Sequence, residues 1–132
     1  MSHAIANCMI VRRYQDLDCW RLAYQVKQKV YAVIARPEVA RDFKFCDQIR
    51  DSARSAPSNI AEGFGRFRPA DNARFCEFAK ASLMETDNHI LDALDLKYVT
   101  RNEWKRLFQL TDRAIGAVTK YIAYLKGPGR DH

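Results

Sequence analysis

The chain has 132 residues, of which 48% are hydrophobic and 29% charged, and this length and composition fit one globular domain. No apolar run approaches the ~20 residues that a membrane-spanning helix requires. The short apolar stretch at residues 8–11 has no basic segment before it, as a signal peptide would need. We therefore expect a cytoplasmic protein with no membrane partner.

The formal net charge of +6 is concentrated near the C-terminus. Residues 97–130 contain eight Lys or Arg against only two acidic residues, Glu103 and Asp112. Residues 1–96 contain fourteen basic and thirteen acidic residues and are nearly neutral. A basic C-terminal segment favours an anionic partner.

The cysteines and histidines do not indicate a metal site. The four cysteines are scattered without any Cys-x-x-Cys pair, at Cys8, Cys19, Cys46 and Cys76. Structural metal sites usually bring their ligands in closely spaced pairs. We therefore expect free thiols, no metal and no cofactor.

The first fifteen residues carry no clear period and are expected to form a loose N-terminal arm (residues 1–15). A helix is predicted from Asp18 onward, because apolar residues recur at steps of three and four. Its stripe consists of Ala23, Val26, Val30, Val33 and Ile34, and a second stripe beside it of Trp20, Tyr24 and Tyr31. Pro37 disfavours helical geometry in Arg36 and interrupts the pattern there.

The second helix is predicted to begin between residues 39 and 43 and to contain Pro57. Its stripe spans roughly 100° of a helical wheel and consists of Phe45, Ile49, Ala53, Ala56, Ile60 and Phe64. A proline costs ~3 kcal/mol inside a straight helix. We interpret Pro57 as a kink among small residues that let another helix approach, namely Ser52, Ala53, Ser55, Ala56 and Ser58. Gly63 or Gly65 is expected to take a left-handed cap.

The third helix is predicted from Pro69, which suits a first helical turn, to about Leu96. Its predicted core stripe consists of Phe75, Phe78, Ala79, Ser82, Thr86, Ile90 and Ala93. A second apolar arc lies beside this stripe, although one helix of a four-helix bundle needs only one buried face. We therefore predict that the second arc is an oligomer interface, formed by Cys76, Leu83, Met84, Leu91 and Leu94.

The last helix opens with a capping box from Thr100 to Glu103. Its core stripe consists of Trp104, Leu107, Phe108, Thr111, Ala114, Val118, Ile122 and Leu125. A tail at residues 127–132 follows. Because nothing alternates with period two, we predict an all-α fold, an antiparallel up-down four-helix bundle over residues 16–126.

A short connection near Arg68 makes the second and third helices an antiparallel hairpin, so opposed residues should have numbers that sum to about 136. This register predicts structural charge pairs between the two helices. The pairs are Arg50 and Arg54 with Glu85, and Glu62 with Arg74. Asn59 is predicted as a further structural polar residue.

Three stretches carry a resemblance to a known family. They are "SNIAEGFGR" at residues 58–66, "DLDCW" at residues 16–20, and "FCEFAKASLMETDNHILDALDLKYV" at residues 75–99. The chain resembles, over roughly residues 14–126, the four-helix bundle proteins called 23S rRNA intervening sequence proteins, also known as S23 ribosomal proteins. It departs from the family pattern at Arg68, Ala81 and Lys97, where a capping Ser or Thr, a glycine and a helix-ending glycine are usual.

The resemblance implies a homopentamer of four-helix bundles around a central opening. It also implies a relation to the accessory variability determinant of diversity-generating retroelements, a pentamer that binds nucleic acid and a reverse transcriptase. The added basic residues Arg68 and Lys97 could strengthen binding to an anion.

The leading functional hypothesis is a non-catalytic scaffold that binds RNA or DNA. Arg106, Arg113 and Lys120 lie within about 40° on the last helix, opposite its apolar stripe. This basic ridge is joined at one end by Lys97, Arg101 and Lys105. In a ring of subunits the ridge would be repeated and would make salt-sensitive phosphate contacts. The alternative interpretation of these basic residues is an ordinary solvent-exposed helix face with no binding role.

The connection at residues 63–69 interleaves Phe64 and Phe67 with Arg66 and Arg68. Aromatic rings among arginines could stack on unpaired bases. In the structural interpretation, Phe64 closes the core and Phe67 staples the next helix. Arg66 and Arg68 are predicted to contact nucleic acid.

Two other functions are alternatives to nucleic-acid binding. A protein-interaction module would dock a partner such as a polymerase through apolar residues such as Met84 and Leu91. An enzyme is the weakest hypothesis, because the sequence has no phosphate loop, metal cluster or nucleophile–base pair. A catalytic Ser58–Glu62 pair lacks a histidine or lysine base in helical register, so we predict no catalytic residue.

Overall fold

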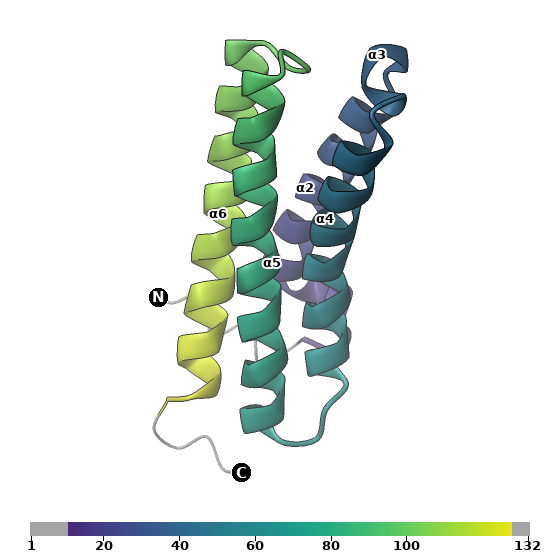
Figure 1. Ribbon diagram of the computed structural model, residues 1–132. Coiled ribbons are helices and arrows are strands. Elements are labelled where there is room, and N and C mark those ends of the chain that lie inside the picture. Colours follow the sequence, from purple (N-terminus) through teal and green to yellow (C-terminus); the bar gives the residue numbers. More distant parts are fainter. Residues whose placement is uncertain (1–10, 128–132) are drawn as a thin grey trace.

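The computed structural model describes residues 11–127, and every regular element within them is helical. The elements are a 3-10 turn η1 (Tyr14–Asp16) and the α-helices α2 (Asp18–Ile34), α3 (Pro37–Ala40), α4 (Phe43–Phe64), α5 (Pro69–Asp95) and α6 (Arg101–Leu125). The four long helices run alternately up and down, and each packs on two neighbours in the cyclic order α2, α4, α5, α6 (Figure 1). The prediction of an all-α helical bundle is confirmed.

The helix ends follow local sequence signals. Arg36 is extended, with ψ of 136°, before Pro37, which begins the short helix α3 that the sequence pattern did not predict. Pro69 stands in the first turn of α5, as expected. The capping box of α6 is formed, because Thr100 accepts from the backbone of Glu103 and Glu103 accepts from the backbone of Thr100.

The glycine cap predicted for α4 is wrong, and the left-handed residue lies elsewhere. Gly65 follows α4 with φ of −76°, in the ordinary right-handed region. Lys97, after α5, has φ of 63° and is the one non-glycine residue with positive φ in the described part of the chain. The backbone N–H of Tyr98 donates to Ala93 and that of Lys97 to Leu94, so Lys97 occupies a Schellman position where glycine is preferred.

The apolar stripes predicted for α2 and α4 form the core, together with most of the stripe predicted for α6. The exceptions on α6 are Trp104, which is half-buried, and Phe108, which is 39% exposed. On η1, Tyr14 packs against the core, and Leu17 between η1 and α2 is buried. The expected loose arm falls mainly on residues 1–10, and most of the expected tail on residues 128–132, which lie outside the described residues.

The stripe on α5 differs from the prediction. Cys76 and Leu83 were assigned to an oligomer interface, but both are fully buried in the core of the single chain. Phe78 was assigned to the core but is 46% exposed. Because α5 packs against α4 on one side and α6 on the other, its buried arc lies midway between the two predicted arcs. Of the predicted interface residues, Met84 and Leu91 are exposed, and Leu94 is partly buried against the core.

The charge pairs predicted between α4 and α5 are wrong. The five charged side chains have other partners, three or four residues away in sequence or on a neighbouring ring. The ion pairs are Arg50 with Asp47, Arg54 with Asp51, Glu85 with His89, and Glu62 with Arg66 in the turn after α4. The Arg74 guanidinium lies over the rings of Phe75 and Phe78. Partners three or four residues away are already close on a helix surface, so a long side chain reaches them without crossing to the next helix.

The polar contacts between α4 and α5 are instead hydrogen bonds between small hydroxyl side chains. The Ser82 hydroxyl donates to that of Ser55 at 2.9 Å, and the hydroxyls of Thr86 and Ser52 also lie 2.9 Å apart. These pairs have numbers that sum to 137 and 138, close to the predicted register. Asn59 donates from Nδ2 to the carbonyl and the hydroxyl of Ser55, both at 2.9 Å. Asn59 is therefore a structural polar residue, as expected.

Helix α4 runs through Pro57 without interruption from Phe43 to Phe64. The proline ring is buried, and so are its small neighbours Ser52, Ala53 and Ala56, whereas Ser58 is exposed. The prediction that small residues let a second helix approach is confirmed where Ser52 and Ser55 meet α5.

A polar latch joins the ends of three helices at the upper end of the bundle. Arg36, after α2, donates from Nη2 to Glu103 of α6 at 2.6 Å and from Nη1 to the carbonyl of Tyr98 at 3.0 Å. The Tyr98 hydroxyl donates to Asp42, the N-cap of α4, at 2.5 Å. The hydrogen bond from Arg36, followed by the backbone hydrogen bond at Thr100, lowers the pKa of Glu103 to about 2.

The depressed pKa of Glu103 predicts acid sensitivity of the fold. An unfolded glutamate has a pKa of about 4.3, so the stabilisation from Glu103 is complete above about pH 4.3 and is lost as the pH falls towards 2. We expect Glu103→Gln to lower the free energy of unfolding at pH 7 and to flatten its dependence on pH in this window. The measurement is urea unfolding, followed by circular dichroism, between pH 7 and pH 2.5.

The control for this experiment is Glu62→Gln, which removes an exposed ion pair between the end of α4 and the turn that follows it. Exposed pairs contribute ~0–1 kcal/mol, so this variant should stay close to the wild type at every pH. Parallel pH profiles for the wild type and Glu103→Gln would contradict the prediction.

Candidate nucleic-acid interface

The basic ridge consists of Arg106, Arg113 and Lys120 on α6, and all three side chains are exposed. Residues seven apart lie on one face of a helix about 10.5 Å from each other along its axis. The ridge is positioned by the opposite face of α6, where Leu107, Ala114 and Val118 are buried. The core packing of α6 therefore presents the three cations to solvent in one row.

The positive charge of the ridge is not neutralised by nearby carboxylates within residues 11–127. Among the described residues, none of its three cations forms an ion pair, whereas Arg21, Arg50 and Arg54 each pair with an aspartate three residues earlier. The reason lies in the sequence, because residues 97–127 contain only two carboxylates. Glu103 is held by Arg36 and the capping box, so it does not neutralise the ridge.

Asp112, the second of these carboxylates, lies near Asp87 of α5. Burial raises the pKa of Asp87, and the negative charge of Asp112 raises it further. The two negative charges repel each other, so Asp112 adds no stabilisation to Asp87.

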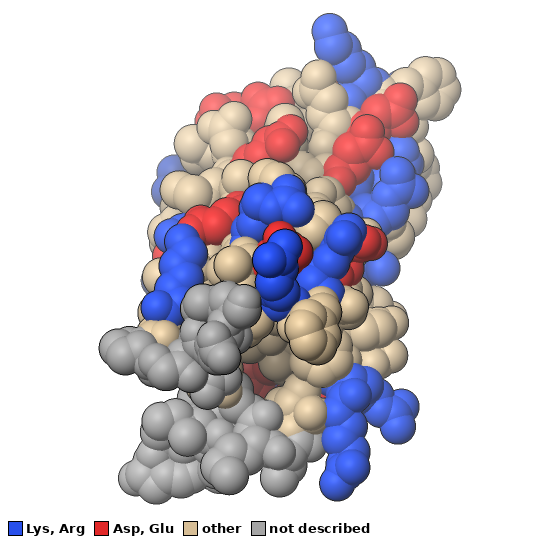
Figure 2. All heavy atoms as spheres, turned by 90° about the horizontal axis from the view of Figure 1, so that it is seen from below, with Lys and Arg blue, Asp and Glu red and all other residues tan. Residues whose placement is uncertain are grey.

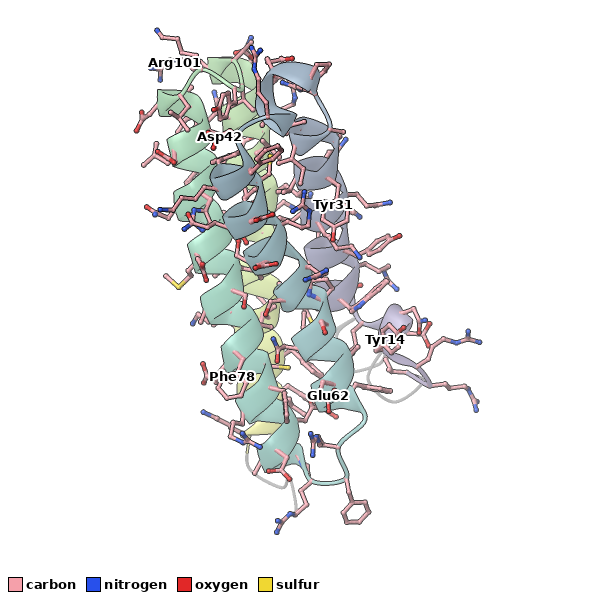
Figure 3. The ribbon with its side chains drawn as sticks, turned by 45° about the vertical axis from the view of Figure 1, so that its right-hand side comes forward. Tyr14, Tyr31, Asp42, Glu62, Phe78 and Arg101 are labelled. Atoms are coloured by element: carbon pink, nitrogen blue, oxygen red, sulfur yellow. The ribbon has the colours of Figure 1, made fainter. Side chains whose placement is uncertain are left out.

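The remaining predicted contact residues form two groups at opposite ends of the bundle. Lys97, Arg101 and Lys105 lie at the turn between α5 and α6, and all three are exposed; Arg101 marks this end in Figure 3. Arg66 and Arg68 lie at the turn between α4 and α5, at the other end (Figure 1). The ridge on α6 extends between these two groups.

The end of the bundle that carries the α4–α5 turn is rich in basic and aromatic side chains. Figure 2 looks onto this end and shows basic side chains gathered across it, with acidic side chains between them. The Arg66 guanidinium lies 4.6 Å from the ring centre of Phe75 and pairs with Glu62 at 2.9 Å. Phe64 packs against the core, as the structural interpretation predicted, but Phe67 is 98% exposed and does not staple α5.

An aromatic groove between α2 and α4 was not predicted as a site. It has a volume of about 450 Å³ and is lined by Tyr14, Trp20, Tyr24, Lys27, Arg54, Pro57, Ser58, Ala61 and Glu62. The rings of Trp20 and Tyr24 are stacked with centres 4.8 Å apart, and Lys27 lies 4.9 Å over Tyr24. Tyr14 and Tyr31 mark this side of the molecule in Figure 3. In the sequence, the aromatic stripe predicted on α2 beside the core stripe was the signal that could have indicated this groove.

The thiols offer no reactive or metal-binding chemistry in the described part of the chain. Cys19, Cys46 and Cys76 are free and buried, while Cys8 lies outside the described residues. Burial raises the pKa of Cys76 to about 12 and also raises that of Cys19 and Cys46. Within residues 11–127, no group of three His, Cys, Asp or Glu side chains could hold a metal ion. No helix in that range is long and apolar enough to cross a membrane.

These features define an all-helical bundle protein with a basic exposed face on α6 and a polar latch at one end. The sequence profile of the family described as 23S rRNA-intervening sequence protein matches residues 15–120. The chain belongs to this family, and the resemblance in the three sequence stretches is confirmed. No curated protein sequence matches the chain.

Proposed function

We propose that the protein is a non-catalytic, cytoplasmic scaffold that binds RNA or DNA through the phosphate backbone. The observation that carries this proposal is the row of three exposed cations on α6, none of which forms an ion pair within residues 11–127. Their rise of about 21 Å along the helix axis covers several phosphates of a nucleic-acid strand. Contacts of this kind fix position without reading sequence, so the proposed binding tolerates many sequences.

The proposal includes assembly of the subunits into a ring, which the family resemblance implies as a homopentamer. Met84 and Leu91 of α5, 57% and 45% exposed, are the predicted interface residues that remain available on the surface of the subunit. A ring would repeat the ridge in each subunit and sum the positive potentials. Binding would then be tighter and more sensitive to salt than binding to one subunit.

The second candidate function is a protein-docking module without direct nucleic-acid binding. The aromatic groove between α2 and α4 favours it, because Trp and Tyr are enriched at protein interfaces. Docking of a partner such as a polymerase through this groove, or through Met84 and Leu91, would survive moderate salt. Phosphate binding would not, so salt dependence separates the two functions.

The test is fluorescence anisotropy of labelled structured RNA and duplex DNA across a salt series. In the triple variant Arg106→Glu, Arg113→Glu, Lys120→Glu, we expect at least a tenfold loss of affinity at low salt. The slope of log K against log salt should fall by about 2 to 3, because each lost duplex phosphate contact removes ~0.9.

The matched control reverses three exposed cations on other faces, with Lys29→Glu, Arg41→Glu and Lys44→Glu. Both triple variants change the net charge equally, so only the position of the charges differs. Equal losses in the two variants would mean that net charge, rather than the ridge, drives binding. Absence of binding by the wild type at low salt would overturn the proposed function.

A further inference from the structure

The turn between α4 and α5 exposes an aromatic ring that has no role in the fold. Phe67 is 98% exposed, more than any other large apolar side chain in the described part of the chain. The neighbouring Phe64 already closes this end of the core. Exposing a phenylalanine so fully gains no burial within the subunit, so the ring is available to a partner.

The charges around Phe67 indicate the chemistry of that partner. The ring stands between Arg66 and Arg68, which are both exposed, and Arg74 lies one turn into α5. Glu62 is occupied by Arg66, and Glu77 by Lys126 at 3.2 Å. Asp71, in the first turn of α5, is half-buried. Among the described residues, Arg68 and Arg74 have no carboxylate partner, so the turn favours an anion over an apolar protein surface.

The arginines and aromatic rings of this end also stack on one another. The guanidinium of Arg74 lies 5.0 Å from the ring centre of Phe75 and 5.7 Å from that of Phe78. A nucleotide has both features that such a surface binds, a flat base for an aromatic ring and a phosphate for an arginine. A fully paired duplex offers no free base face along its length, whereas a loop, bulge or overhang does.

We propose that Phe67 stacks on an unpaired base while Arg68 and Arg74, which have no carboxylate partner among the described residues, hold the adjoining phosphates. This inference rests on the proposed function, because the same nucleic acid would be held by the ridge. The C-terminal end of α6 is tied to α5 by the Lys126–Glu77 pair, so the Lys120 end of the ridge and the α4–α5 turn lie at the same end of the bundle. The preferred ligand is therefore a duplex that carries a single-stranded overhang or loop.

The experiment compares a blunt RNA duplex with the same duplex bearing a short overhang that contains 2-aminopurine. We expect Phe67→Ala to weaken binding of the overhang duplex by at least about fivefold and to abolish the change in 2-aminopurine fluorescence. Binding of the blunt duplex should not change. Phe67→Tyr should retain both signals, because tyrosine keeps the stacking face.

The matched control is Phe43→Ala, which removes an aromatic ring that is 76% exposed at the other end of the bundle. It should change neither signal. If Phe67→Ala binds the overhang duplex like the wild type while the ridge variant loses the blunt duplex, the inference is overturned and the proposed function stands. If the wild type binds neither duplex, both fail.

Sedimentation velocity of the same variants tests whether the Phe67 side chain instead packs against a second copy of the protein. A lower oligomeric state for Phe67→Ala at equal protein concentration would show that Phe67 packs into a second copy of the chain. That result would overturn base stacking. An unchanged oligomeric state, together with loss of the 2-aminopurine signal, supports it.

Discussion

Leu83→Ala is expected to lower the free energy of unfolding by about 2 to 5 kcal/mol. Leu83 is fully buried on α5, so the substitution removes apolar atoms from the core and leaves a cavity. The matched substitution on the same helix is Leu91→Ala, at a position that is 45% exposed. Its effect on the subunit should stay within about 0.5 kcal/mol. Urea unfolding followed by circular dichroism measures both.

This comparison separates a core residue from an interface residue. If Leu83 stabilised only an oligomer, the loss would depend on protein concentration, because assembly is linked to stability by mass action. A core residue gives the same loss at every concentration. A cost below 1 kcal/mol for Leu83→Ala, or an effect that disappears on dilution, would return Leu83 to the interface that the sequence pattern first predicted.

The burial of Leu83 shows a case in which sequence periodicity does not identify the buried face of a helix. On α2, α4 and α6 one narrow stripe predicted the buried face, because apolar residues at steps of three and four define a single direction on a helix. On α5 two adjacent arcs were apolar, and no local signal gave the direction of its two neighbours. The choice between Leu83 and Phe78 for the core depended on tertiary packing.

Among the polar contacts, some were likewise predictable from the sequence and others were not. The capping box at Thr100 and Glu103 is local, and the sequence predicted it correctly. The register of the α4–α5 hairpin was also predictable, because a short turn fixes which residues are opposed. The partners of Arg50 and Glu85 were not, since long side chains choose among several carboxylates or cations within reach. The latch of Arg36 with Glu103 joins residues 67 apart and left no pattern in the sequence.

For the candidate interface, the sequence predicted where the positive charge lies, but it did not predict the shape of the surface around it. The surplus of cations after residue 96 and their seven-residue spacing placed the ridge on the exposed face of α6. Neither feature could give the exposure of Phe67, because an apolar residue just before a helix N-cap often packs onto that helix as a hydrophobic staple. The groove beside Trp20 likewise needs two helices to form its walls, and only the fold brings them together.

Gly63→Ala is expected to destabilise the fold by about 1 to 3 kcal/mol, the range for overpacking a close contact. A Cβ atom at Gly63 would lie 2.8 Å from Oδ1 and 2.9 Å from the backbone oxygen of Asn72, and 3.0 Å from the Cβ of Phe75. The backbone of α5 would have to retreat from α4 to make room. Asn72 resists this movement, because its side chain donates to the Tyr121 hydroxyl of α6 at 3.0 Å.

The same substitution at Gly116 should act in the opposite direction. Gly116 is exposed inside α6, and no atom lies within 4 Å of the position that a Cβ would take. Alanine there should therefore stabilise the helix by roughly 0.5 to 1 kcal/mol. Urea unfolding of both variants gives the sign of each effect. Stabilisation by Gly63→Ala would contradict the close approach of α4 and α5, on which the placement of the turn that carries Phe67 depends.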